Sequence, residues 1–223
     1  MTKNKKWFLY LVIVIFIVLG LFIIFSIQIP RPKSLSQNKI SEPNLISDFG
    51  SLPPWGNPQA PVKIVEYGDF HCPFCTQAVI TLYPYLEKLI NEGKVVLYFR
   101  DFPIKELHPT AYNVHLASRC ANEQNRYWDF HKKALLDYLS GLGTKTGELN
   151  YLLNLAESLN LNTTSFMLCY QSRRYEPEII KDLTSGFKLN VRGTPTFFIN
   201  GKMVEGLDPK SIIDLIKSEL NQK

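Results

Sequence analysis

Residues 66–75 are Glu-Tyr-Gly-Asp-Phe-His-Cys-Pro-Phe-Cys, which ends in two cysteines three positions apart. A β-rich run, Val62–Tyr67, leads into them, and apolar residues at helical spacing follow. A cysteine at a helix start meets unpaired N–H groups and the positive end of the helix dipole, which favours its thiolate and lowers its pKa. Pro73 suits the first position of such a helix. The pattern therefore predicts a redox dithiol in which Cys72 is the reactive thiol and Cys75 is shielded one turn further on.

Two other interpretations of this cysteine pair are disfavoured. A zinc ribbon needs a second close pair, but Cys120 and Cys169 lie far along the chain and 49 positions apart. A purely structural disulfide between Cys72 and Cys75 would be strained and reducible at this short spacing. The sequence therefore predicts no metal site.

Apolar residues continue at spacings of three and four beyond Cys75 and predict an amphipathic helix that ends at Gly93. They are Val79, Leu82, Tyr83, Leu86, Leu89 and Ile90. Pro84 lies inside this helix and is expected to bend it. Val95–Phe99 is expected to be a second strand.

Three further segments have helical spacing with polar faces: Ala111–Leu139, Glu148–Leu159 and Thr163–Phe187. A strand over Pro195–Ile199 then meets Asn200-Gly201, a strong hairpin signal, and Met203-Val204 continues on the other side. Asp208 and Pro209 are suited to be the N-cap and first residue of a last helix. In outline the predicted order is strand, helix, strand, a helical insertion, then a hairpin and a helix.

The composition excludes several classes of protein. The 223 residues are 45% hydrophobic and 20% charged, unlike a disordered chain. Residues 1–30 contain three lysines and no acidic residue, which leaves 22 basic residues against 20 acidic ones in the remainder. Because that remainder is nearly neutral and has no basic stripe, nucleic acid binding has no electrostatic basis.

The segment Trp7–Ile29 contains 23 consecutive uncharged, mostly apolar residues, enough to span a bilayer as a helix. A cleaved signal peptide is the alternative, but it would have a shorter apolar core and a small-residue cleavage site. We expect an uncleaved signal anchor preceded by a cytoplasmic tail at 1–6 and followed by a tether at 30–56. The predicted location is the cell membrane, single-pass, with the C-terminal domain extracytoplasmic.

Residues 66–75, together with Arg192-Gly193-Thr194-Pro195-Thr196-Phe197-Phe198-Ile199-Asn200-Gly201, resemble the DsbA family of thioredoxin-fold thiol–disulfide oxidoreductases, in its membrane-tethered form. The resemblance implies a thioredoxin fold over 57–223, an α/β fold with a mixed central sheet flanked by helices and a helical insertion at about 107–187. It also implies that Pro195 is cis and lies against the Cys72–Cys75 turn. Thr194 would then offer its backbone to an extended substrate peptide.

The resemblance suggests a role for Glu66, because the family often has an acid buried beneath the disulfide. There it would accept a proton from Cys75 or tune its electrostatics, with Lys94 opposite on the next strand. The alternative, from strand alternation with Val65 inward, is an exposed acid at a strand edge.

Two residues beside the cysteines modify the expected chemistry. The family's best-known member has Pro-His between its cysteines, whereas Phe74 here cannot donate a hydrogen bond or positive charge to the Cys72 thiolate. We therefore expect a less extreme oxidant. His71 is expected to be a surface residue that faces substrate.

Cys120 and Cys169 both fall in predicted helices of the insertion. Two free buried thiols would be ordinary in a core. In an oxidising compartment, however, an even number of cysteines favours a second bond. The family's tethered members also have a second pair here, and the resemblance therefore implies a structural disulfide between these two residues.

These observations favour an enzyme, a membrane-anchored protein disulfide oxidoreductase that introduces disulfides into exported proteins. A reductase or isomerase with the same site is the first alternative, and a non-catalytic peptide-binding chaperone is the second. The expected partners are reduced or unfolded exported proteins and a membrane quinone-linked reoxidase of the DsbB or VKOR kind. No cofactor is expected, and the protein is expected to be a monomer.

Overall fold

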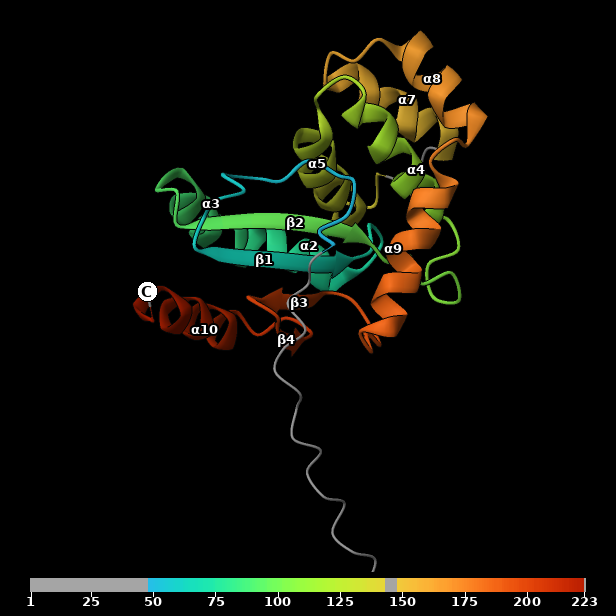
Figure 1. The fold of residues 1–223 in the computed structure, drawn as a ribbon. Coiled ribbons are helices and arrows are strands. Elements are labelled where there is room, and N and C mark those ends of the chain that lie inside the picture. The colour runs from blue at the N-terminus through green and yellow to red at the C-terminus, as the bar shows by residue number, and fades with distance from the viewer. Residues whose placement is uncertain (1–47, 143–147, 223) are drawn as a thin grey trace, which may run out of the picture. The chain divides into compact units, whose positions relative to one another are not determined.

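The centre of the computed structural model is a four-stranded sheet in the order β2-β1-β3-β4 (Figure 1). The structure describes residues 48–142 and 148–222. The strands are β1 (Val62–Gly68), β2 (Val95–Asp101), β3 (Thr196–Ile199) and β4 (Lys202–Glu205). β1 pairs in parallel with β2, whereas β3 is antiparallel to both β1 and β4. This arrangement confirms the predicted mixed sheet.

Helices connect the strands in the predicted order. α2 (Pro73–Thr81) and α3 (Tyr83–Asn91) link β1 to β2, and α10 (Pro209–Asn221) follows the hairpin. The insertion between β2 and β3 consists of α4 (Ala111–Asn122), α5 (Tyr127–Leu139), α7 (Glu148–Ser158), α8 (Thr163–Ser172) and α9 (Glu176–Lys188). Figure 1 shows α4, α5, α7 and α8 grouped beyond one end of the sheet, with α9 returning the chain toward β3.

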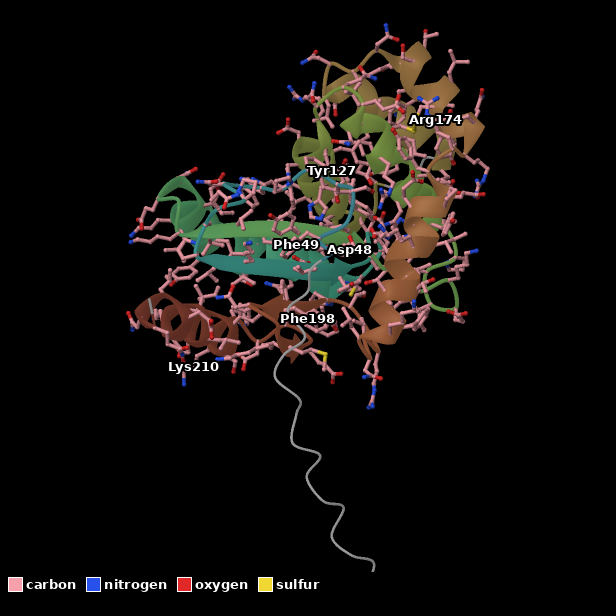
Figure 2. The ribbon with its side chains drawn as sticks, viewed as in Figure 1. Asp48, Phe49, Tyr127, Arg174, Phe198 and Lys210 are labelled. Carbon is pink, nitrogen blue, oxygen red and sulfur yellow. A yellow bond between two sulfur atoms is a disulfide. The ribbon has the colours of Figure 1, made fainter. Side chains whose placement is uncertain are left out.

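Both faces of the sheet are covered by apolar side chains. Ile64 and Leu97 belong to the large core beneath α2 and α3, which also includes Ile212 and Ile216 of α10. A smaller core on the opposite face contains Tyr67, Tyr98 and Phe198, packed against Phe49 and Leu183. Phe49 and Phe198 are labelled in Figure 2. A side chain in the middle of this sheet is therefore buried, whichever face of the sheet it points to.

Three of the predicted helices are each divided into two shorter helices. The predicted helix with a bend at Pro84 is instead two helices that meet at Leu82, and Pro84 lies in the first turn of the second one. Proline is tolerated there because the first N–H groups of a helix have no intrahelical partner. The two long predicted helices of the insertion also divide, at Asn125 and at Arg173, which both have positive φ angles of 57° and 51°.

Residues 48–56, here called the N-terminal strap, were assigned to the tether but pack on the domain. Phe49 stacks on Tyr98 with ring centroids 4.4 Å apart. Trp55 exchanges two backbone hydrogen bonds with Leu97, of 2.8 and 3.0 Å, at the outer edge of β2. The apolar and aromatic side chains of this segment explain the difference, since burying them stabilises its docking.

No helix among residues 48–142 and 148–222 is long and apolar enough to cross a membrane. The predicted cytoplasmic tail at 1–6, the predicted anchor at Trp7–Ile29 and residues 30–47 of the predicted tether lie outside the described residues. These assignments stay predictions.

Candidate active site

Cys72 is the N-cap of α2, and Pro73 is the first residue of the helix. The sequence folds this way because Cys72 keeps an extended backbone, with φ −82° and ψ 120°, and proline then sets the helical φ. Cys72 is 4% exposed, whereas Cys75, one turn into the helix, is fully buried. Both are free thiols, so the structure represents the reduced state.

The two thiols differ in acidity as their positions require. Hydrogen bonding from the Cys75 thiol, and then from Thr194 and the backbone N–H groups of Cys75 and Phe74, lowers the pKa of Cys72 to about 6 against the opposing effect of burial. Burial, and then the nearby Cys72 and Glu66, raise the pKa of Cys75 well above its ordinary value. Cys72 is therefore the thiolate nucleophile near neutral pH, and Cys75 stays protonated.

The loop before β3 lies against this turn. The Thr194–Pro195 peptide bond is cis, and the Cys72 thiol donates a hydrogen bond to the Thr194 carbonyl oxygen over 3.1 Å. The dithiol turn and the Thr194–Pro195 loop, both implied by the resemblance, therefore lie in contact, although more than a hundred positions separate them in the sequence.

Glu66 lies on the α2–α3 side of the sheet and is fully buried. The Tyr83 hydroxyl donates a hydrogen bond of 2.9 Å to its Oε2 atom. Burial raises the pKa of Glu66 to about 8, so the side chain is mainly protonated at neutral pH. The alternative of an exposed edge acid is wrong because both faces of the sheet are covered. Lys94 is not its partner: it precedes β2 and pairs with Glu92 on the surface, and Phe99 lies opposite Glu66.

We expect Glu66→Gln to stabilise the reduced protein at pH 9 while changing its stability little at pH 4. Between the unfolded pKa of about 4.3 and the folded value of about 8, the folded chain holds a proton that the unfolded chain has released. Wild-type stability therefore falls as pH rises through this window, whereas Gln has no proton to lose. Urea denaturation at several pH values should show a difference that opens to about 3–5 kcal/mol at pH 9. A difference independent of pH would contradict the buried-acid assignment.

His71 was expected at the surface, but this prediction is wrong: the side chain is buried, at 7% exposed. Its ring stacks on Tyr138 of α5 at 4.5 Å between centroids, and burial lowers its pKa to about 4. It is therefore neutral and supplies no positive charge to Cys72. Phe74, in contrast, is 64% exposed beside the dithiol and supplies an apolar contact surface.

Sequence reasoning missed Asp69, which organises the loop before Cys72. This fully buried carboxylate accepts hydrogen bonds from the backbone N–H groups of His71 and Ile104, both 2.8 Å, and lies 2.9 Å from Nδ1 of His108. It joins the dithiol loop to the loop after β2. An Asp before a turn is a recognisable local signal, but nothing in the sequence indicated the contact with His108.

Cys120 of α4 and Cys169 of α8 form a disulfide, with an S–S distance of 1.98 Å. Both are buried between the two helices, at 2% and 1% exposed. The bond lies within the insertion and is separate from the Cys72–Cys75 pair. Among residues 48–142 and 148–222, no group of three or more His, Cys, Asp or Glu side chains is placed to hold a metal ion.

A dithiol at a helix N-terminus beside a cis-proline, on a mixed sheet of this topology, defines the class of thioredoxin-fold thiol–disulfide oxidoreductases. The family described as Thioredoxin matches residues 52–218. The chain belongs to this family, and its relatives place it among the DsbA-like members.

The similar proteins agree on this class. A "Probable disulfide bond formation protein D" of Bacillus anthracis is 28% identical over 199 residues, which cover 85% of this chain and 88% of that protein. The oxidised BdbD structure from Bacillus subtilis has a TM-score of 0.65 and 25% identity, over 76% of this chain and 93% of that chain. Alpha-DsbA1 of Wolbachia pipientis, at 24% identity and a TM-score of 0.67, covers 77% and 94% and shares the fold.

Another relative is much longer than this chain. The "Na(+)/H(+) antiporter NhaA 1" of Salinispora arenicola is 34% identical over 154 residues, or 68% of this chain. The matched part is 22% of that protein, so the chain spans about a fifth of the length of the first curated relatives it matches. The substrates, direction and partners of the whole protein are therefore matters of proposal.

Proposed function

We propose that this protein is a membrane-anchored, extracytoplasmic thiol–disulfide oxidoreductase that introduces disulfides into exported proteins. The observation that carries the proposal is the unequal pair of thiols beside the cis-proline. Cys72 has its pKa lowered to about 6, and Cys75 is buried with its pKa raised. Stabilising the thiolate of the reduced form makes the corresponding disulfide a stronger oxidant.

The reaction follows from this geometry. A substrate thiolate attacks Cys72 Sγ of the oxidised enzyme, the Cys72–Cys75 bond breaks, and Cys75 takes the electron pair and then a proton. A second substrate thiolate attacks the substrate sulfur of the mixed disulfide, and Cys72 leaves as a stable thiolate. The substrate is oxidised by two electrons and the enzyme is reduced by two.

Phe74 and Thr194 bear on the direction of the reaction. Phe74 cannot donate a hydrogen bond to the Cys72 thiolate, so we expect a weaker oxidant than a Pro-His site would give. Thr194 before the cis-proline is also compatible with a reductase or isomerase. The hypothesis of a chaperone that binds peptides without redox chemistry is disfavoured, because both cysteines are present and differ in acidity.

The reduction potential of Cys72–Cys75, measured against glutathione, tests the direction. We expect a value between about −200 and −120 mV, above that of thioredoxin at about −270 mV. The matched variant Phe74→His restores a hydrogen-bond donor and should move the potential toward less negative values. A wild-type potential below about −250 mV would instead identify a reductase.

The charge-free segment Trp7–Ile29 supports the proposed anchor, and a quinone-linked membrane protein would be a suitable reoxidase for an enzyme held at the membrane. Protease added to intact cells or spheroplasts is expected to digest the C-terminal domain, and a cytoplasmic protein serves as the protected control. Full protection of the domain, or a mature protein that begins after residue 26, would reject the anchored topology.

A further inference from the structure

One side of α9 is exposed along the whole length of the helix. Its residues recur at spacings of three, four and seven positions, which is the spacing of a single helix face. They are Pro177, Ile180, Lys181, Thr184, Phe187 and Lys188, here called the α9 stripe. Figure 1 shows α9 in orange at the margin of the domain, where it returns the chain from the insertion toward β3. The α9 stripe therefore faces away from the core.

The opposite side of α9 fixes the helix to the domain. Ile179 and Asp182 are buried, at 0% and 1% exposed, and Asp182 pairs with the buried Arg119 over 2.8 Å. A Cβ atom on Gly186 would collide with the Phe102 ring, so the helix backbone lies directly against that side chain. The α9 stripe is consequently a surface of fixed shape.

The α9 stripe combines two large apolar side chains with two lysines. Ile180 is 55% exposed and Phe187 is 64% exposed, and each is followed directly by a lysine. The Phe187 ring contacts the Phe102 ring, with 5.1 Å between their centroids, while most of it stays exposed. No acidic residue belongs to the stripe. Exposed apolar side chains next to lysines are typical of helices that bind the surface of an anionic bilayer.

Arg192 extends the positive charge toward the dithiol. It is exposed and lies in the connection between α9 and the cis-proline. Among residues 48–142 and 148–222, neither Lys188 nor Arg192 has an ion-pair partner. Their charges are therefore available to an anionic partner outside the domain.

The chain enters the described domain beside the α9 stripe. Asp48 is the first described residue, and its Oδ2 atom lies 3.2 Å from Nζ of Lys181. Residues 30–47 separate it from the predicted anchor, and 18 residues span at most about 60 Å. A membrane anchor would hold the stripe within this distance of the bilayer. Tethering makes docking an intramolecular event, so that a weak intrinsic affinity is sufficient.

We propose that the α9 stripe docks on the surface of an anionic bilayer, with Ile180 and Phe187 among the lipid headgroups and Lys188 and Arg192 against lipid phosphates. The inference rests on the membrane anchor of the proposed function. Single exposed apolar residues are ordinary on protein surfaces. The adjacent lysines and the position of Asp48 distinguish this stripe from them.

Docking would bring the dithiol close to the bilayer. Phe187 and Thr194 are seven positions apart and thus separated by at most about 25 Å. The Thr194 carbonyl oxygen in turn accepts a hydrogen bond from the Cys72 thiol. A membrane-embedded partner would then meet Cys72 at a defined height above the bilayer, instead of anywhere within reach of the tether.

Lysine acetylation measures the docking. The full chain is reconstituted as single copies in nanodiscs of phosphatidylcholine, with or without phosphatidylglycerol, and mass spectrometry gives the acetylation rate at each lysine. Lys188 is expected to react about fivefold or more slowly in the anionic discs. Lys210 of α10, labelled in Figure 2, is the internal control and should react equally in both. High salt should abolish the difference, because it screens the attraction.

Variants separate the apolar contribution from the charged one. Ile180→Ser combined with Phe187→Ser should remove most of the protection of Lys188 in anionic discs, and Arg192→Glu should reduce it as well. Leu168→Ser is the matched control, because Leu168 on α8 is also 64% exposed, and it should leave the protection unchanged. Arg192→Glu remains informative if the double variant does not fold.

Equal reactivity of Lys188 in neutral and anionic discs would overturn the proposal. Protection found only in discs that hold two copies would also overturn it, because the stripe would then bind a second copy of the chain. Retention in the discs at high salt tests the anchor separately. A retained chain with unprotected Lys188 rejects the docking and keeps the anchor. A chain that high salt releases, but whose Lys188 is protected at low salt, rejects the anchor and keeps the docking.

Discussion

A Cys75→Ala variant is expected to retain a substrate thiol on Cys72 as a stable mixed disulfide. The variant would first be treated with Ellman's reagent, which places thionitrobenzoate on Cys72, and then with a reduced protein that has a single cysteine. That cysteine displaces thionitrobenzoate, and without Cys75 no thiol within the enzyme can release the adduct. Non-reducing electrophoresis should show nearly complete conversion to the covalent complex.

Cys72→Ala is the matched control, and it should form no adduct under the same conditions, because Cys75 is fully buried with a raised pKa. Cys120 and Cys169 are joined to each other and do not interfere. The pKa of Cys72 should also rise in Cys75→Ala, since hydrogen bonding from Cys75 is the largest cause of its lowering. Adducts on Cys72→Ala would show that the roles of the two thiols are reversed.

Arg119→Met is expected to cause the largest loss of stability away from the dithiol. Arg119 is 2% exposed, and its Nε and Nη2 atoms lie 2.6 Å from Asp101 and 2.8 Å from Asp182. Removing the guanidinium leaves two buried carboxylates with too little positive charge, at a cost of about 3–5 kcal/mol. Arg100 remains 2.6 Å from Asp182 and 3.5 Å from Asp48, and Asp101 keeps His115 as a partner.

The pH dependence separates lost charge from lost packing in this variant. Arg119 is the largest attractive influence on Asp101, which has its pKa lowered to about 2 despite burial. Without Arg119 that pKa should rise above its unfolded value, and the deficit relative to wild type should then grow as pH increases. Arg174→Met, at the exposed pair with Glu123 in the insertion, is the control and should have a small effect at every pH. A deficit that does not change with pH would mean that packing alone is lost.

The order of strands and helices and the dithiol could be predicted because their signals are local, whereas the thioredoxin fold was predicted from the family resemblance. A Cys-Pro-Phe-Cys after a strand places its first sulfur at a helix start whatever the rest of the chain does. The Asn200-Gly201 hairpin and the Asp208 N-cap are equally local, and the structure has both a hairpin and an N-cap there. Each of these features depends only on the conformation of a few adjacent residues.

Other features depend on which elements pack together, and sequence patterns do not contain that information. Alternation along β1 indicates that Glu66 and Val65 point to opposite faces of the sheet, but it cannot indicate that both faces are covered. His71 is buried because Tyr138, from a helix 67 positions away, stacks on it. The partnership of Asp69 with His108 likewise appears only when the loop after β2 returns to the dithiol. The helices break at Asn125 and Arg173, where the backbone has a positive φ angle, and the spacing of apolar positions does not reveal this.

The pairing of Trp55 with Leu97 also bears on how the protein avoids aggregation. Exposed sheet edges are templates for strand addition, and proteins protect them with short strands, charged residues or covering segments. Here the outer edge of β2 is occupied by the backbone of Trp55 and, at Asp101 N–H, by the Asp182 carboxylate. The other edge, β4, is four residues long and carries Lys202 and Glu205. Under the proposed function, unfolded substrate chains would therefore find neither edge of this sheet available as a long unpaired strand on which to accumulate as β-sheet.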